Sequence, residues 1–394
     1  MLSKKKNKIR IGINDFFPFM DGFDIAINFS ILIFLSSFIL QDLDSRVSIL
    51  IMSSIILLSF ASRIFDLNFL KILKKYKLSG VNIFLLFILI YFLPLLIQKN
   101  FPVVLSVFIF SLSRVLFGVI ISLSYRNVNI NQESFSIDIS GISFWIFYSL
   151  GLAFGVLIYL FINELYSNND LNDGAWKIFY LIKLIMIGIF YFIIKMIFKI
   201  KMHFKHDVIH DELRISAASG INCFIILIPL ICFILFISSN WLPKFSNPEN
   251  LYFLNFNFIN FLLIIMMLAF IVPLASLVGK KRSIIFFNFS IISLSLLISL
   301  IGHDSSYSID FLKFYLSIVS SFTICCFIFQ LEVTKLKIFS IYNCINQSLL
   351  ICSLIIPPLF YIFINYVINY SVIYIVISIV YLINYIFVMY KKNG

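Results

Sequence analysis

Charged residues are scarce in this chain. Only 12% of its 394 residues are charged, whereas 61% are hydrophobic. Soluble globular domains average about 25% charged and about 45–50% apolar residues. Polar side chains are therefore too few to cover the surface of a folded monomer in water. The composition excludes a soluble monomer and favours a protein of the lipid bilayer.

Patterns that mark catalytic or metal sites are also missing. The six cysteines form no CxxC pair and no cluster with histidine, so neither a disulfide framework nor a zinc site is indicated. His206 and His210 are spaced i,i+4, but we interpret their segment as a solvated linker. The sequence has no nucleotide-binding loop and no HExxH, GxSxG or paired-carboxylate pattern. We therefore expect no enzyme activity, no catalytic residue, no metal and no cofactor.

Apolar runs account for most of the chain. A hydrocarbon core of about 30 Å is crossed by about 20 helical residues. The runs have about this length, which predicts an all-α polytopic membrane protein with twelve transmembrane helices. The first run is too long for the apolar part of a signal peptide and has no small-x-small cleavage site, so we expect a retained first span. The runs are 16–40, 47–66, 80–97, 103–124, 138–162, 176–198, 216–238, 252–278, 284–301, 311–330, 345–364 and 369–390.

Lysine and arginine alternate between the connecting segments in a way that predicts orientation. If the N-terminus is cytoplasmic, most of them fall in cytoplasmic segments, as the positive-inside rule requires. Both termini then lie in the cytoplasm. The richness in Phe, Ile, Asn and Lys favours a bacterial source, so we expect the bacterial inner membrane. The lysines and arginines that fall in outer segments are Arg46, Lys99, Lys177 and Lys244.

The net charge of +12 does not indicate nucleic-acid binding, because the basic residues sit in short clusters between apolar runs. The longest inner segment, 199–215, is basic and divides the runs into two sets of six. We predict an N-terminal six-helix half (1–198), a cytoplasmic linker (199–215) and a C-terminal six-helix half (216–394). Two such halves around a midplane cavity are a common plan of transporters.

Four short motifs, together with this topology, resemble those of the major facilitator superfamily. The motif in span 4 resembles R-x-x-x-G, and span 5 carries a similar glycine-bearing packing motif. Span 6 opens like G-x-W-R-x-x-F, and the loop before span 9 ends like G-R-R-[RK]. The resemblance implies the major facilitator fold, alternating access between two halves and a monomer. The motifs are Arg114 to Gly118, Gly151 to Gly155, Gly174 to Phe179 and Gly279 to Arg282.

Span 1 carries Asp21-Gly22-Phe23-Asp24, which is similar to the D-G-[FY]-D motif of the aromatic acid/proton symporter branch. Other positions depart from the superfamily. Segment 70–77 keeps the basic charge of the usual loop between spans 2 and 3 but lacks its glycines and aspartate. In members of the superfamily, that loop controls the conformational cycle of transport. A non-transporting sensor or binding protein is therefore the alternative interpretation.

Charged side chains inside spans are candidates for function because each costs about 2.5–3.5 kcal/mol to insert. Asp21 and Asp24 share one helical face, and Asn28 continues it. Arg114 is central in span 4, which lines the cavity in the family fold together with span 1. An Asp24–Arg114 pair is therefore plausible. We predict substrate-binding or proton-coupling roles for Asp21, Asp24, Arg114 and Asn28, with helix locking as the alternative.

Other polar residues in the spans are assigned less specifically. Lys183 and Lys313 lie near span ends, where long side chains reach the interface, so we predict that both extend to the membrane surface. Three neutral residues are candidates for the substrate cavity, and joining helices is their alternative role. These are Asn222, Asn346 and Gln347.

The sequence thus predicts a secondary active transporter of a small polar metabolite, driven by protons. The resemblance implies an organic acid, an amino acid or a betaine-type osmolyte as substrate. The expected partners are this substrate, the proton and the bilayer. A polytopic membrane transferase is less favoured, because it needs a long outer loop with clustered Arg, His or acidic residues. The outer segments 163–175 and 239–251 have no such cluster.

Overall fold

A computed structural model of the chain describes residues 13–65, 80–130, 137–193 and 278–301, with isolated positions from 266 onward. Helices make up nearly all of these ranges, and no strand occurs in them. Most of the predicted C-terminal half lies outside the described residues, as does the predicted linker 199–215. The division into two six-helix halves therefore stays a prediction.

The six apolar runs of the N-terminal half are helical at nearly all of their described residues. The observed ends differ from the predicted ones by a few residues, and α12 begins four residues before its predicted span. The helices are α1 (Ile13–Ser30), α2 (Leu32–Ile39), α3 (Ser45–Ala61), η1 (Ser62–Phe65), α5 (Gly80–Phe92), η2 (Leu93–Leu96), α6 (Val103–Ile130), α7 (Ile137–Leu165), α8 (Asn168–Asp170), η3 (Leu171–Ala175), α9 (Lys177–Ile193) and α12 (Lys280–Ile301).

Several of these helices are long and apolar enough to cross a bilayer. Within the described residues, α6 and α7 meet this criterion alone, through 103–124 and 146–165. Two further candidates are bent pairs: α1 and α2 meet at 60°, and the α8–η3 segment meets α9 at 67°. The first bent pair coincides with the predicted span 16–40. In the second, α9 falls within the predicted span 176–198, whereas α8 and η3 lie in the predicted outer segment 163–175. Two to four spans are thus present among the described residues by length and composition.

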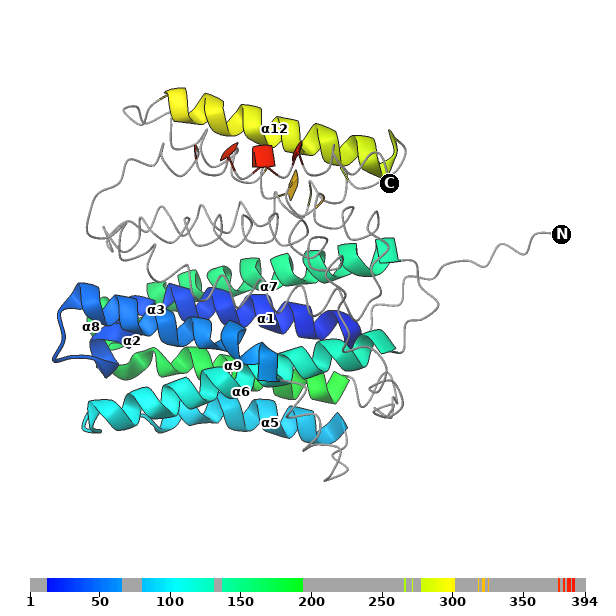
Figure 1. Cartoon of the computed structure of the whole chain (residues 1–394). Coiled ribbons are helices and arrows are strands. Elements are labelled where there is room, and N and C mark those ends of the chain that lie inside the picture. The colour runs from blue at the N-terminus through cyan, green and yellow to red at the C-terminus, as the bar shows by residue number, and fades with distance from the viewer. Residues whose placement is uncertain are drawn as a thin grey trace.

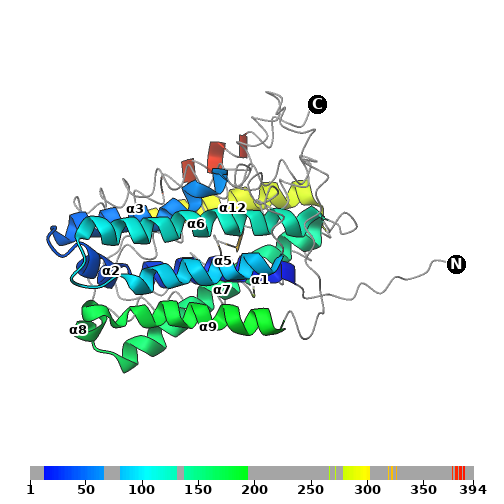
Figure 2. The same ribbon diagram turned by 90° about the horizontal axis from the view of Figure 1, so that it is seen from below.

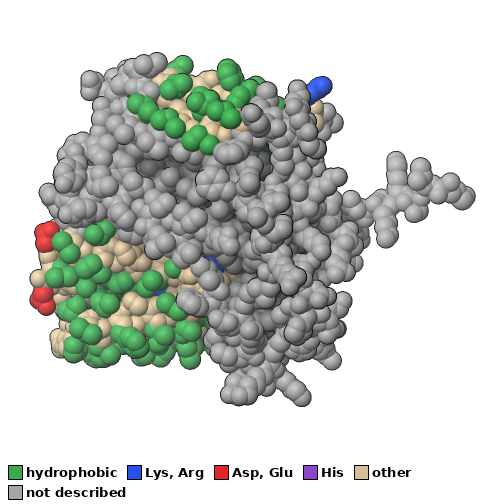
Figure 3. Space-filling model, in the orientation of Figure 1, with side chains coloured by type: hydrophobic (Ala, Val, Ile, Leu, Met, Phe, Trp, Pro, Cys, Tyr) green, Lys and Arg blue, Asp and Glu red, His purple; other side chains and the backbone are tan. Residues whose placement is uncertain are grey.

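The outward faces of the helices carry large apolar side chains at helical spacing. On α9, Leu181, Ile185 and Ile189 follow each other at intervals of four residues, and each is about half exposed. Similar exposed residues lie on α5 and α6, and hydrophobic side chains dominate the described surface in Figure 3. Water would not stabilise such a surface, whereas lipid chains would.

The helix α1 lies among the other helices of the N-terminal half, as Figures 1 and 2 both show. Its most extensive contact is with α7, and glycines make this contact close. A Cβ atom on Gly151 would lie 2.8 Å from Phe23 N, and one on Gly155 would lie 2.7 Å from Ala26 Cβ. The predicted packing role of the Gly151–Gly155 motif is thus confirmed in geometry.

The segments predicted to face outward meet at one end of the bundle. Ser37 donates a 2.8 Å hydrogen bond to Asn172, and Gln41 donates one of 3.2 Å to the carbonyl of Lys99. The exposed ion pair between Lys99 and Asp173 measures 2.7 Å. These contacts join α2, the segment after it, η3 and the turn before α6, so these segments lie at the same end of the bundle.

Candidate functional site

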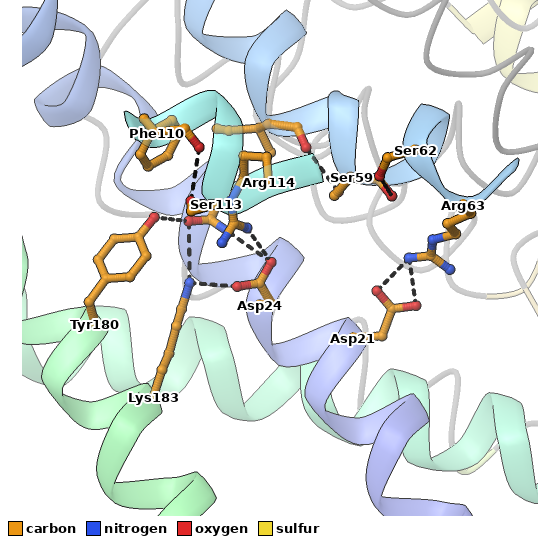
Figure 4. A network of polar contacts seen from close by, with 12 residues as sticks. Asp21, Asp24, Ser59, Ser62, Arg63, Phe110, Ser113, Arg114, Tyr180 and Lys183 are labelled. Atoms are coloured by element: carbon orange, nitrogen blue, oxygen red, sulfur yellow. Dashed lines mark hydrogen bonds and ion pairs between the residues drawn. The ribbon is translucent and has the colours of Figure 1, made fainter. Parts of the chain in front are cut away.

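Three charged side chains from three helices meet inside the N-terminal half. Asp24 lies on α1, Arg114 on α6 and Lys183 on α9. Arg114 Nη1 lies 2.6 Å from Asp24 Oδ2, and Lys183 Nζ lies 2.8 Å from Asp24 Oδ1. Figure 4 shows the two cations approaching the carboxylate from different helices. All three side chains are at most 1% exposed.

Two neutral side chains complete this cluster. Asn28, one turn after Asp24 on α1, donates a 2.9 Å hydrogen bond from Nδ2 to Asp24 Oδ2. Its Oδ1 accepts hydrogen bonds from Tyr180 Oη, at 2.6 Å, and from Lys183 Nζ, at 3.2 Å. Asn28 therefore links the carboxylate to the α9 side chains and fixes its own amide orientation. We call Asp24, Asn28, Arg114, Tyr180 and Lys183 the central cluster.

Aromatic rings surround the cations of the central cluster. The guanidinium carbon of Arg114 lies 5.7 Å and 5.3 Å from the ring centroids of Phe110 and Phe117. Lys183 Nζ lies 4.4 Å from the ring centroid of Tyr180. Such rings attract cations through their negative faces while they exclude water. The charges thus interact in surroundings of low polarity, where ion pairs and unpaired charges both have large effects.

The tryptophan of the span-6 motif packs against the cluster from the end of the bundle where α8 and η3 lie. Gly174 has a φ of 119°, a backbone conformation that side chains rarely adopt, and it lies at the bend before α9. Trp176 follows and is fully buried. Its ring centroid lies 5.5 Å from that of Phe38 and 5.8 Å from that of Tyr180. The bend and the tryptophan therefore hold Tyr180 where it can reach Asn28.

A second buried ion pair lies one helical turn away along α1. Arg63, in η1, donates two hydrogen bonds from Nη2 to the carboxylate of Asp21, at 2.7 Å and 2.9 Å. Both side chains are about 2–3% exposed. The Arg63 guanidinium also lies 4.9 Å from the ring centroid of Phe60. Arg63 lies near the end of the predicted span 47–66, and sequence reasoning did not identify it as a site residue.

The prediction that Lys183 extends to the membrane surface was wrong. Its side chain is fully buried and points to Asp24. A signal for this position exists in the sequence, because Trp176, Phe179, Tyr180, Lys183 and Ile187 follow the spacing of one helical face. All five are fully buried. A lysine in the middle of an aromatic stripe is better explained by a buried partner than by the interface.

The remaining candidates divide into two groups. The structure brings Asp24, Arg114 and Asn28 together, and Asp21 pairs with Arg63 instead. Their predicted roles in transport stay predictions. The other candidates lie outside the described residues: Asn222, Asn346, Gln347 and Lys313.

Two solved structures with a similar arrangement of helices are of transporters. The inward-open xylose transporter XylE from E. coli aligns with a TM-score of 0.64 at 12% identity, over 96% of this chain and 95% of that chain. The human organic anion transporter MFSD10 aligns with a TM-score of 0.62 at 10% identity, over 95% and 98%. No protein-family model matches the chain, and no curated protein matches it in sequence.

These alignments cover nearly the whole of each chain, so the chain has the major facilitator fold that its motifs predict. It is a multi-pass, all-α membrane protein. At such low identity the similarity concerns the fold, and the function has to be argued from the central cluster.

Proposed function

We propose that the protein is a secondary active transporter of a small polar metabolite, coupled to protons and working by alternating access. The observation that carries the proposal is the buried contact of Asp24 with Arg114 and Lys183. A charge in the middle of a membrane helix costs about 2.5–3.5 kcal/mol on insertion scales. Three such charges on three helices indicate a site that handles ions, since apolar residues would pack the helices at lower cost.

The substrate class follows from the sign of the charge. The cluster holds two cations and one carboxylate, so it favours substrates with an anionic group. Organic acids have such a group, and amino acids and betaines also carry a carboxylate. The two solved structures with this fold are of an organic anion transporter and a xylose transporter, so the shared fold alone does not select the substrate.

Asp24 is the proposed proton carrier. While it contacts Arg114 and Lys183, its ionised form is stabilised. A substrate or a helix movement that takes the cations away leaves a carboxylate in apolar surroundings, where the neutral acid costs less. Proton uptake by Asp24 is then linked to release of the cations. Asp21 is a second candidate for this linkage, through Arg63.

The other parts of the proposal rest on the fold and on the sequence. We propose a monomer in the bacterial inner membrane with both termini cytoplasmic. The solved proteins that share the fold are transporters, which supports a transport protein over an enzyme. A non-transporting binding protein is the competing function, in which the central cluster would only brace α1, α6 and α9.

Uptake into proteoliposomes tests the proposal. Vesicles with an inward proton gradient are offered labelled organic acids, amino acids and betaines. We expect gradient-driven uptake of at least one substrate by the native protein, and its loss in Arg114→Ala. The matched control is Lys99→Gln, which removes a lysine from the exposed pair with Asp173. No uptake of any compound by correctly folded native protein would favour the non-transporting alternative.

A further inference from the structure

The two cations of the central cluster share one carboxylate. Arg114 and Lys183 contact different oxygens of Asp24. Within the part of the chain that the structure describes, neither forms an ion pair with a second acidic side chain. The formal charges therefore sum to +1, in a cluster that is at most 1% exposed. A buried charge without a counter-ion is strongly unfavourable, so this surplus calls for an additional anion.

An unsatisfied donor independently indicates where such an anion would bind. Arg114 Nη2 is buried and has no hydrogen-bond partner among the described residues, although Nη1 of the same guanidinium contacts Asp24. Buried donors of this kind are rare in proteins, because leaving one unpaired costs about 1–3 kcal/mol. A guanidinium characteristically binds a carboxylate through two parallel hydrogen bonds. Here Asp24 occupies only one of these two positions.

We propose that Arg114 and Lys183 form a two-cation receptor for one carboxylate group of the substrate, and that Asp24 occupies this receptor when no substrate is bound. The inference rests on the proposed transport function and specifies which group of the substrate is recognised. The substrate carboxylate first binds Arg114 Nη2 and then displaces Asp24. Lys183 keeps an acceptor during this exchange, because Asn28 Oδ1 lies 3.2 Å from its Nζ.

The charge balance allows one substrate carboxylate to replace Asp24. If Asp24 leaves as the neutral acid, one bound carboxylate reduces the charge of the cluster from +2 to +1, the same value as with ionised Asp24 in place. For a substrate with one net negative charge, the proton on Asp24 and the substrate together carry no net charge, so its transport is electroneutral.

Acetate is a suitable probe, because it consists of little more than the group that the receptor binds. Purified Asp24→Asn protein keeps both cations and lacks the internal carboxylate. We expect acetate to raise its melting temperature with increasing concentration, since a ligand that binds only the folded state stabilises it. Acetamide, the neutral analogue, should have no effect. Sodium chloride at equal ionic strength should have a much smaller effect than acetate.

A second substitution assigns the effect to Lys183. In the Asp24→Asn background, Lys183→Gln should weaken the apparent acetate affinity at least tenfold, whereas Lys99→Gln should leave it unchanged. The native protein and the Lys183→Gln single variant provide a second comparison if Asp24→Asn does not fold. The formal charge of the cluster falls from +1 to zero in that single variant, so the weaker acetate effect of the native protein should disappear.

The outcomes separate this inference from the proposed function. Equal stabilisation by acetate and chloride, or an acetate effect that survives Lys183→Gln, would overturn the receptor. Proton-driven uptake by the native protein combined with no acetate effect in any variant would also overturn it, and would leave transport standing. Acetate binding that depends on Lys183, in a protein without uptake, would support the receptor and overturn transport.

Discussion

Replacing Gly151 by alanine should separate α1 from α7. A Cβ atom at this position would lie 2.8 Å from Phe23 N and closer still to the carbonyl oxygen of Phe19, whereas real Cβ atoms essentially never approach within 3.0 Å of another atom. Both neighbours are backbone atoms, which cannot rotate away. Overpacking of this kind typically costs about 1–3 kcal/mol. The higher helix propensity of alanine returns at most about 1 kcal/mol.

The shift should also reach the central cluster. Phe23 directly precedes Asp24, so a displaced α1 lengthens the contacts of the carboxylate with Arg114 and Lys183. We therefore expect Gly151→Ala to lower both the melting temperature in detergent and substrate uptake. The control is Gly188→Ala on α9, where a Cβ atom would meet nothing within 4 Å. If Gly151→Ala proved as stable and active as Gly188→Ala, the close packing of α1 and α7 would be refuted.

Three further predictions concern other contacts. Asp21→Asn should destabilise the protein by about 3–5 kcal/mol, because it removes one partner of a buried ion pair, and the double variant with Arg63→Met should recover part of the loss. Chemical denaturation measures the free energy of unfolding of the single and the double variant. Losses that simply add in the double variant would contradict an ion pair between Asp21 and Arg63. Trp176→Ala should cost about 3–5 kcal/mol through the cavity that it leaves, and an unchanged melting temperature would argue against its burial. Lys99→Gln and Asp173→Asn should each change stability by less than about 1 kcal/mol at moderate salt, since this ion pair is exposed. A larger loss in the same assay would show that the pair stabilises the end of the bundle where α2 and η3 meet.

The sequence contains enough information to predict the fold. Apolar runs of about 20 residues and the alternation of basic segments predict the helices that the structure describes in the N-terminal half. The glycines at 151 and 155 were correctly predicted to pack helices, because small residues are what close helix contact in a membrane requires. The bends were not predicted, although Gly174 lies at one of them.

The site was predicted only in part, because sequence spacing relates residues within one helix and not between helices. The i,i+4 relation of Asp24 and Asn28 follows from the helical repeat, and the Asp24–Arg114 contact was suggested by the family resemblance. The partner of Asp21 and the burial of Lys183 depend on how distant helices rotate against each other. For Lys183, we applied the rule that lysines near span ends extend to the interface. Its position on the same helical face as its aromatic neighbours was the better indicator.

The most direct test of the central cluster as a transport site compares two assays on Asp24→Asn. One measures uptake driven by a proton gradient, and the other measures exchange of labelled for unlabelled substrate without a gradient. We predict that gradient-driven uptake is lost while exchange persists, because the receptor keeps Arg114 and Lys183 and only the proton carrier is gone. Gradient-driven uptake at the native level would contradict the coupling role of Asp24. Loss of both activities in a stable protein would contradict a substrate site and indicate a structural brace.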